Sequence, residues 1–452
     1  MNQPKIAVIG AGITGLTLGR LLPGSVVYEK SSFIGGPSRT LHYKDFHFDI
    51  GLHWLPHLST EAETFLNPFM GNGVSKVSTS GEKITWFKNN HRLREIYHPL
   101  DFPFEENPLL ALNFAASYYW RQVFPKNGNS LESHLINSRG DCYYKLFSRD
   151  FVHKFLGVPP DQISLPELPP KERESFLQRL IRWIRRGGRR LPLPKINLEV
   201  PYPLPWFGVI VDKLAEGLEI RRSSALTKIH LSGQKVTGIE INHREKISCE
   251  HLILTLPPHS FVPLLNPPQE VLQAAQGIRY RDLIYAVLFF DAEQVMEESL
   301  VIALGKEIFA RAIEPKNWSK QTAPPHQTSV CFEIPCFEGD SLWLSPDPAI
   351  LKKVSEDFRS YYSVPEPFDG IVIRIPRFRP IFDQNLAAHL KILRGFASSL
   401  KNIYFPSDNL FLQGTNINTA VTEALRIAKE VQITSQPEEI SNAAAPLTDR
   451  IY

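Results

Sequence analysis

The chain has 452 residues, of which 43% are hydrophobic and 21% are charged, so a large core can form and wholesale disorder is excluded. Its 50 lysines and arginines exceed its 47 aspartates and glutamates by only three, which argues against a protein that mainly coats nucleic acid. The four cysteines form no C-x-x-C pair and indicate neither a disulfide scaffold nor a structural zinc site, so we expect a protein of the reduced cytoplasm.

The first thirty residues carry the pattern of a dinucleotide-binding unit. Residues 5–10 (KIAVIG) form an apolar run typical of a buried parallel strand, and residues 13–22 have helical periodicity. Residues 25–30 (SVVYEK) predict a second strand. Between the first strand and the helix lies G-A-G-I-T-G. In that motif the first glycine permits a tight turn, the second lets a pyrophosphate approach the backbone, and the third lets helix and strand pack closely.

An acidic residue follows at the spacing that this motif requires. Glu29 comes 19 residues after Gly10, where a carboxylate can accept hydrogen bonds from the ribose hydroxyls of an adenine dinucleotide. The same carboxylate disfavours a 2′-phosphate, so NADP is not expected. A chance glycine motif on an ordinary strand–helix turn is the alternative, and the correct flanking elements argue against it.

The next segments resemble a known family. Residues 31–40 read SSFIGGPSRT and residues 48–53 read FDIGLH, directly after the strand that carries the acid. This order resembles the flavin amine-oxidase superfamily, which includes protoporphyrinogen oxidases, phytoene desaturases and UDP-galactopyranose mutases. The resemblance implies FAD as the cofactor, with the Gly35-Gly36 turn beside the pyrophosphate, Arg39 along the cofactor and residues 49–53 near the isoalloxazine.

Further segments of the same resemblance recur late in the chain. Residues 202–218 resemble the family's Y-P-x-x-G segment and its helix, and residues 226–249 alternate as a β meander. Backbone groups near Ala225 and Leu226 would contact the adenine side of FAD. The last element, residues 409–431, departs from the family, because Gly414-Thr415 replaces the usual Gly-Asp or Gly-Arg.

We therefore predict an α/β fold with a discontinuous Rossmann-like FAD-binding domain and a second, α+β substrate domain. The FAD-binding domain would comprise residues 1–65, 201–261 and 401–435, the substrate domain residues 66–200 and 262–400, and a C-terminal tail residues 436–452. The residues predicted to bind FAD are Gly10, Gly12, Ile13, Thr14, Gly15, Glu29, Lys30, Gly35, Gly36, Ser38, Arg39, Gly51, Leu52, His53, Ala225, Leu226, Gly414, Thr415, Asn418 and Thr419.

Two residues are predicted to act in catalysis. Arg311 follows Phe309 on an expected strand, and in the related proteins such an arginine faces the substrate cavity, where its planar fork holds a carboxylate or phosphate. His53 could lie over the flavin and exchange a hydrogen bond with it. The alternatives are a solvated arginine on a strand face and a structural histidine in the turn. No metal site is expected.

A basic segment lies near the end of the first part of the predicted substrate domain. Residues 175–198 contain seven cations and no acid, interleaved with apolar residues. Three interpretations stay open: peripheral contact of residues 176–195 with an anionic membrane, steering of an anionic substrate, and a solvated helix face. Nucleic acid is not an expected partner.

The sequence thus predicts an FAD-dependent oxidoreductase of the oxidase or desaturase type. Its substrate would be an organic small molecule, lipophilic or anionic, that passes a hydride to the flavin. One alternative is a mutase-like flavoenzyme that acts on a nucleotide sugar without net redox change. The other is a non-catalytic relic whose altered Gly414-Thr415 turn no longer holds flavin.

Overall fold

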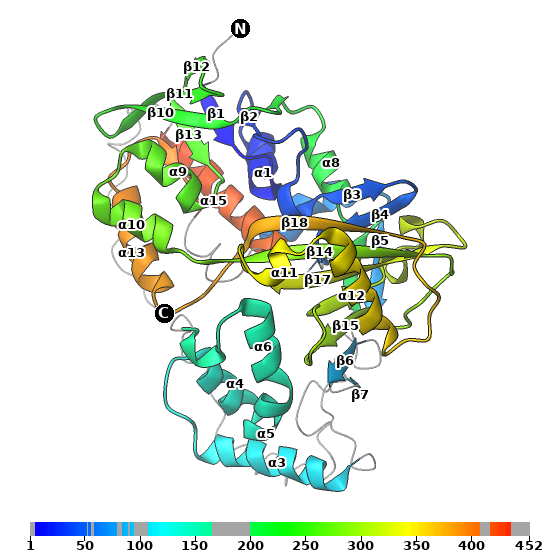
Figure 1. Ribbon diagram of the computed structural model, residues 1–452. Coiled ribbons are helices and arrows are strands. Elements are labelled where there is room, and N and C mark those ends of the chain that lie inside the picture. The colour runs from blue at the N-terminus through cyan, green and yellow to red at the C-terminus, as the bar shows by residue number, and fades with distance from the viewer. Residues whose placement is uncertain are drawn as a thin grey trace. The chain divides into compact units, whose positions relative to one another are not determined.

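The computed structural model describes residues 5–51, 53–55, 58–78, 84–88, 91–94, 107–164, 199–406 and 416–434. It splits into two compact units (Figure 1). The first comprises residues 1–36, 214–272 and 394–452, and the second residues 37–213 and 273–393. Residues 37–65 and 201–213 thus group with the second unit, and the domain limits given above stay a prediction.

A five-stranded parallel sheet forms the centre of the first unit. Its order is β19-β13-β1-β2-β9, with β1 in the middle. The strand sequences explain this placement, since IAVI in β1 and VVY in β2 are almost wholly buried, as expected of a parallel strand covered on both faces. The strands are β1 (Ile6–Ile9), β2 (Val26–Tyr28), β9 (Ile220–Arg221), β13 (His251–Leu254) and β19 (Ile403–Tyr404).

Two helices cover this sheet and a small meander accompanies it. α1 (Ile13–Leu21) packs against α15 (Ile417–Thr434), which joins the first and last described segments of the chain. The meander is antiparallel, as the alternating sequence predicts, and consists of β10 (Leu226–Ser232), β11 (Lys235–Ile241) and β12 (Glu245–Ser248). α9 (Pro258–Phe261) follows β13, and α8 (Val209–Ala215), α10 (Gln269–Gly277) and α13 (Leu386–Ala397) cross the limits between the units in sequence.

The second unit is built on a seven-stranded mixed sheet of order β18-β14-β17-β16-β15-β6-β7. Neighbouring strands are antiparallel except for the parallel pair β15 and β6. The strands are β6 (Ile84–Lys88), β7 (His91–Arg94), β14 (Tyr280–Phe290), β15 (Leu300–Ala303), β16 (Arg311–Ile313), β17 (Thr328–Cys336) and β18 (Asp369–Pro380). Two smaller antiparallel pairs are β3 (Thr40–Tyr43) with β4 (Phe46–Asp49), and β5 (Val74–Ser78) with β8 (Glu199–Pro203).

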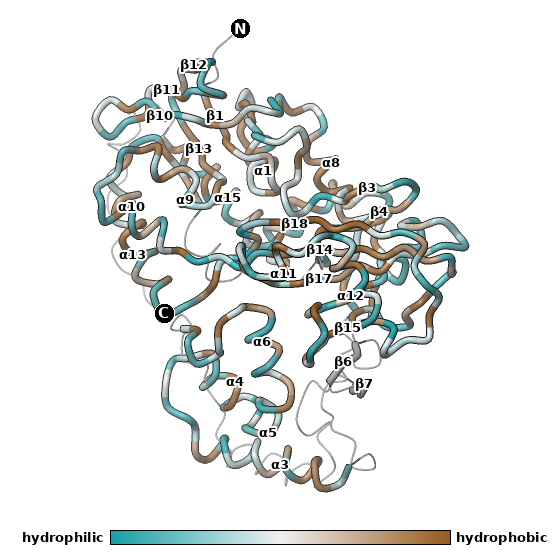
Figure 2. The backbone as a smooth tube through the Cα atoms, in the orientation of Figure 1, coloured by the Kyte–Doolittle hydropathy of each residue, from teal (hydrophilic) through white to brown (hydrophobic). Residues whose placement is uncertain are grey.

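Strand β14 is buried on both of its faces, and its middle part is brown in Figure 2. Its even-numbered residues, such as Ile284 and Leu288, join the core under α12 (Asp347–Arg359). Its odd-numbered residues face the other way, where Phe289 lies 5.2 Å from the ring of Tyr43 and 4.6 Å from that of Phe46. This double burial explains why the strand reads as an uninterrupted apolar run.

The other helices of the second unit are α2 (Thr60–Leu66), α3 (Pro108–Val123), α4 (Leu131–Arg139), α5 (Asp141–Tyr143), α6 (Arg149–Leu156) and α11 (Ser341–Leu344). A π-helical turn, Tyr144–Ser148, connects α5 to α6. Within the described parts of the chain, no helix combines the length and the apolar character that crossing a membrane requires.

Candidate functional site

The glycine loop of the first unit has the backbone form that its motif predicts. Gly10 has a φ of +103°, which favours glycine, and a Cβ added to Gly15 would lie 1.8 Å from the carbonyl oxygen of Gly10. A Cβ on Gly12, by contrast, would meet no protein atom within 4 Å. The fold itself therefore requires Gly10 and Gly15, whereas Gly12 leaves open space at the start of α1.

The start of α1 can receive an anion. Gly12 is the N-cap residue, no side chain caps the first turn, and that turn contains no acid. Ile13 and Thr14 are buried in the turn, so their backbone belongs to the loop while their side chains pack inward. Helix N-termini of this kind favour phosphate, because their first N–H groups lack partners in the helix.

The second glycine motif lies beside the first. The Gly35 N–H donates to the Ala11 carbonyl at 2.7 Å, and Gly12 and Gly35 form a β-bridge. Gly35 and Gly36 have φ values of +93° and +54°. Two loops that are more than twenty residues apart in sequence thus present bare backbone side by side.

Glu29 connects these loops. Its Oε2 accepts the Ala11 N–H at 2.9 Å, and its Oε1 accepts the Ser31 N–H at 2.9 Å. A carboxylate has about four lone-pair directions, so acceptor capacity remains for ribose hydroxyls. Glu29 therefore has a structural task in the protein besides the predicted contact with a ligand. The neighbouring Lys30 is exposed.

The backbone groups of Ala225, which are predicted to contact adenine, have partners within the protein. The Ser224 N–H donates to the Glu29 carbonyl at 2.8 Å, which places this segment beside the acid. However, the Ala225 N–H donates to Oδ1 of Asn242 at 2.9 Å, and the Ala225 carbonyl accepts the Asn242 N–H at 2.9 Å. Adenine could bind the Ala225 amide only by displacing the Asn242 side chain. Leu226 begins β10.

At the last predicted cofactor element, Asn416 and Thr419 cap α15. The Thr419 N–H donates to Oδ1 of Asn416 at 3.0 Å, and the Asn416 N–H donates to Oγ1 of Thr419 at 3.3 Å. Asn418 lies in the first turn of this helix. Gly414 and Thr415, whose departure from the family pattern is the main open question of the sequence, lie outside the described residues, as does Leu52.

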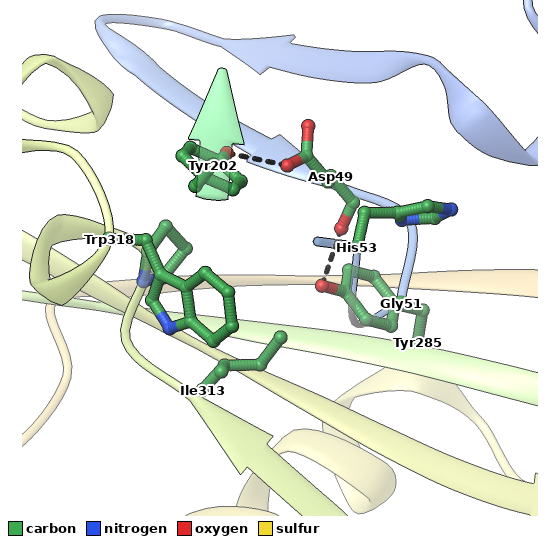
Figure 3. Close-up of a pocket in the computed structure, with 8 residues that line it drawn as sticks. Asp49, Gly51, His53, Tyr202, Tyr285, Ile313 and Trp318 are labelled. Carbon is green, nitrogen blue, oxygen red and sulfur yellow. Dashed lines mark hydrogen bonds between the residues drawn. The ribbon is translucent and has the colours of Figure 1, made fainter. Parts of the chain in front are cut away.

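In the second unit, a buried carboxylate connects three strands (Figure 3). Asp49, at the end of β4, accepts hydrogen bonds from Thr40 Oγ1 of β3 and from the Tyr202 hydroxyl of β8 at 2.6 Å. Thr40 Oγ1 in turn accepts the Gly208 N–H at 2.8 Å, and the Asp49 carbonyl accepts the Tyr285 hydroxyl at 2.6 Å. Burial raises the pKa of the Asp49 carboxyl, although nearby His53 and the hydrogen bonds oppose this.

A pocket with aromatic walls opens beside this carboxylate. It is small and partly open to solvent. Trp318 lies 5.6 Å from the Tyr202 ring at an angle of 70°, and its indole N–H donates to the Ser299 carbonyl at 2.9 Å. The lining residues are Asp49, Gly51, His53, Tyr202, Tyr285, Ile313, Pro315 and Trp318.

His53 is one of the lining residues, but its ring turns away from the Tyr202 and Trp318 side chains in Figure 3. Its Nδ1 is buried and forms no hydrogen bond within the described part of the chain, and its ring lies 4.9 Å from that of Phe207. Burial lowers the pKa of His53, although the charge of Asp49 opposes this. A neutral ring of this kind can donate or accept one hydrogen bond, which suits the predicted place beside a cofactor.

Arg311 has a protein partner that the sequence did not predict. Its Nε and Nη2 lie 2.7 and 2.5 Å from Oε2 of Glu333, a fully buried residue on the neighbouring strand β17. Its guanidinium carbon lies 4.5 Å from the centre of the Phe155 ring. In this structure the guanidinium of Arg311 binds Glu333. The predicted hydrogen bonds from Arg311 to a substrate stay a prediction.

Several site residues escaped sequence reasoning. The sequence places Asp49 near the isoalloxazine without assigning it a role, and it predicts no role for Glu333. A signal existed for Glu333, because a single acid inside the apolar run VCFEIPC predicts a buried partner of opposite charge. Trp318 and Tyr285 gave no such signal. The basic segment 176–195 lies outside the described residues.

The comparisons with known proteins agree with this geometry. The family described as flavin containing amine oxidoreductase matches residues 13–432. The chain belongs to that family. It is an FAD-dependent oxidoreductase, and the predicted resemblance, the α/β fold class and the FAD cofactor are confirmed. Among curated proteins, none matches the chain significantly.

Solved structures share the fold at low identity. A reduced UDP-galactopyranose mutase is 17% identical with a TM-score of 0.76, and covers 96% of this chain and 97% of its own. A provisionally named protoporphyrinogen oxidase from Exiguobacterium sp. 255-15 is 16% identical with a TM-score of 0.73, covering 96% and 100%. A putrescine oxidase bound to putrescine is 13% identical with a TM-score of 0.65, covering 96% and 99%.

The residues present fit FAD in both units. In the first unit, Gly12 leaves space at an uncapped helix start, and Glu29 keeps acceptor capacity beside it. In the second unit, the buried Nδ1 of His53 has no partner among the described residues. The contacts of the individual residues with FAD stay predictions.

We predict that Gly12→Ala and Gly15→Ala will fail for different reasons. Gly12→Ala should fold but bind FAD at least about tenfold more weakly, because its methyl group enters the open space that the pyrophosphate needs. Gly15→Ala should not fold stably, because its methyl group meets Gly10. Thermal unfolding of the apoproteins and FAD titration distinguish the two. Gly395→Ala, at an open helix position, is the control, and equal FAD affinity in Gly12→Ala would contradict the prediction.

Glu29→Ala should have two effects. FAD affinity should fall about 10–100-fold, as expected for hydrogen bonds to a charged group worth about 1.5–3 kcal/mol. The melting temperature of the apoprotein should also fall, because the Ala11 and Ser31 N–H groups lose their acceptor. Glu29→Gln keeps one carbonyl oxygen as an acceptor, so its FAD affinity and melting temperature should lie between those of wild type and Glu29→Ala. An unchanged melting temperature of the Glu29→Ala apoprotein would show that the hydrogen bonds that Glu29 accepts from Ala11 and Ser31 do not stabilise the protein.

Arg311→Met should destabilise the protein by about 3–5 kcal/mol, because it leaves the buried Glu333 carboxylate unpaired. The double variant Arg311→Met with Glu333→Leu should recover most of this loss. Unfolding free energies in denaturant measure both. Lys352→Met, which breaks an exposed ion pair with Glu356, should change stability by less than about 1 kcal/mol. A similar small loss in Arg311→Met would argue against a stabilising role of the pair.

Proposed function

We propose that the protein oxidises an organic small molecule held in the pocket of the second unit. The observation that carries this proposal is the pocket itself, which has aromatic walls and lies beside the buried carboxylate of Asp49 and the buried ring of His53. When bound, FAD supplies the acceptor for a hydride from the substrate. The chain's own residues bind and orient the substrate.

Each pocket residue has a defined part in this proposal. Tyr202 and Trp318 form a rigid wall that excludes water and presents flat apolar surface to the substrate. Asp49 is occupied by its own hydrogen bonds and is not needed as a base. His53 offers Nδ1 for one hydrogen bond to cofactor or substrate. A hydride transfer needs no strong acid or base, in agreement with the roles of these pocket residues.

The first test measures whether the bound flavin accepts electrons from a substrate. The purified protein should be yellow, and anaerobic mixing with a panel of amines and cyclic hydrocarbons should bleach the flavin with at least one compound. Oxygen or a quinone should then restore the colour. Protein without bound flavin would favour the non-catalytic relic, and bound flavin that no compound in the panel bleaches would count against the oxidase.

A mutase-like activity is the second candidate. Its support is the TM-score of 0.76 with a reduced UDP-galactopyranose mutase. The Gly414-Thr415 turn argues against it, because the mutase resemblance implies a Gly-Arg there. Incubation of the dithionite-reduced protein with UDP-galactopyranose decides the matter. Conversion to the furanose would establish the mutase, and no conversion would leave the oxidase.

We further propose that the protein contacts an anionic membrane surface through residues 176–195 and the outer face of α3. Phe114 and Tyr118 of α3 are buried, whereas Leu109, Leu112 and Trp120 are 75%, 56% and 57% exposed. Tyr119, Val123 and Phe124 extend the same exposed surface. Leucines followed by Trp and Tyr suit a bilayer interface, and the basic segment follows α3 in the sequence.

Vesicle binding tests this contact. Wild type should bind phosphatidylserine vesicles, and Leu112→Gln with Trp120→Gln should bind them more weakly. Replacing Arg182, Arg185, Arg186 and Arg189 by Gln should remove the salt dependence, since each cation contributes about 1 kcal/mol near such a surface. Leu344→Gln changes an equally exposed leucine elsewhere and is the control. Absent vesicle binding with a salt-dependent KM would favour substrate steering, and a dimer that the α3 variant dissolves would assign α3 to a second copy.

A further inference from the structure

A second arginine shares an aromatic ring with Arg311. The guanidinium carbons of Arg311 and Arg379 lie 4.5 and 4.8 Å from the centre of the Phe155 ring. The three residues come from β16, β18 and α6, and Glu333 of β17 completes the group. We call these four residues the arginine cluster.

The charges of this cluster do not balance. The carboxylate of Glu333 lies within hydrogen-bond distance of Arg311 through a single oxygen, Oε2. Arg379 forms no hydrogen bond or ion pair with any residue in the described ranges, although it is half-buried. Burial and the neighbouring charge of Arg311 lower the pKa of Arg379 to about 10, so the group stays charged at neutral pH.

Nearby charges do not supply the missing partner. Lys154, next to Phe155 in the sequence of α6, is directed to Glu307, whose Oε2 lies 3.7 Å from its ammonium. Its ammonium also donates to the carbonyls of Ala303 and Gly305. Protein interiors pair their buried charges, so one unpaired guanidinium beside a second cation indicates a place for an anion.

The cluster borders the pocket. Gly51 lines the pocket, and a Cβ on Gly51 would lie 3.2 Å from Oε1 of Glu333 and 3.5 Å from the ring of Phe378, the residue before Arg379. Glu333 and Arg311 also act electrostatically on His53. The arginine cluster is thus next to the pocket residue Gly51 through Glu333.

We propose that Arg379 binds a carboxylate or phosphate group of the substrate, with Arg311 held behind it by Glu333. This inference rests on the proposed function, because it assigns an anionic group to the molecule that the pocket takes. The planar guanidinium of Arg379 can meet two oxygens of the anion at once, and the Phe155 ring can pack against the apolar part next to that anion. Arg379 thus takes the role in binding the anionic group of the substrate that the sequence predicted for Arg311.

Two simple anions test the proposal without knowledge of the substrate. Calorimetric titration of the FAD-loaded protein with inorganic phosphate and with benzoate, at constant ionic strength, should give saturable binding of at least one. Arg379→Gln should weaken that binding at least about tenfold. Arg379→Lys keeps the charge but loses the planar guanidinium. Its anion affinity should lie between those of wild type and Arg379→Gln. Arg377→Gln, an exposed arginine two residues away on the same strand, is the matched control and should bind like wild type.

The outcomes separate the possibilities. Preferential binding of phosphate assigns a phosphorylated substrate, and preferential binding of benzoate assigns a carboxylate. Binding of neither anion, or equal binding in Arg379→Gln, overturns the proposal. The flavin spectrum of the same sample reports on the proposed function separately, so a failed anion site in a yellow protein does not contradict it. Should Arg379→Gln fail to fold, equal anion affinities of Arg379→Lys and wild type overturn the proposal.

Discussion

The carboxylate of Asp49 joins parts of the second unit that are far apart in the chain. Thr40 and Tyr202 donate to it, and Gly208 is attached through Thr40. The backbone of the same residue accepts the hydroxyl of Tyr285 in the central strand β14. A buried polar group is stable only when its bonds are satisfied, so each donor fixes the position of its own strand. The pocket beside Asp49 exists because these strands meet there.

Much of the first unit could be predicted because its constraints are local. Gly10 and Gly15 are required by contacts within one strand–helix turn, and Glu29 follows at a fixed spacing. The second unit offered fewer such signals. Its pocket is built by Tyr285 and Trp318, which lie more than two hundred residues beyond Asp49 and follow no spacing rule. Pairing across strands set by the tertiary fold decides these contacts.

The arginines illustrate the same limit. A sequence can indicate that Arg311 lies on a strand, but it cannot tell which acid the neighbouring strand presents. Glu333 stands directly opposite Arg311 in the sheet register and engages it. Arg379, on a strand that is not adjacent to either residue, belongs to no motif in the sequence, and the shared ring of Phe155 and the charges of Arg311 and Glu333 connect it with them. Charge balance is a property of the folded sheet.

The tether formed by Glu29 has a consequence for how cofactor and protein come together. Since the carboxylate holds Ala11 and Ser31, and Gly35 meets Ala11, the protein's own hydrogen bonds define the form of these loops and need no contribution from a ligand. Little conformational entropy is then lost when a dinucleotide enters. Apoprotein stripped of flavin should consequently take the cofactor back rapidly and reversibly, in one step and without slow rearrangement. Occupancy in the cell would follow the supply of flavin.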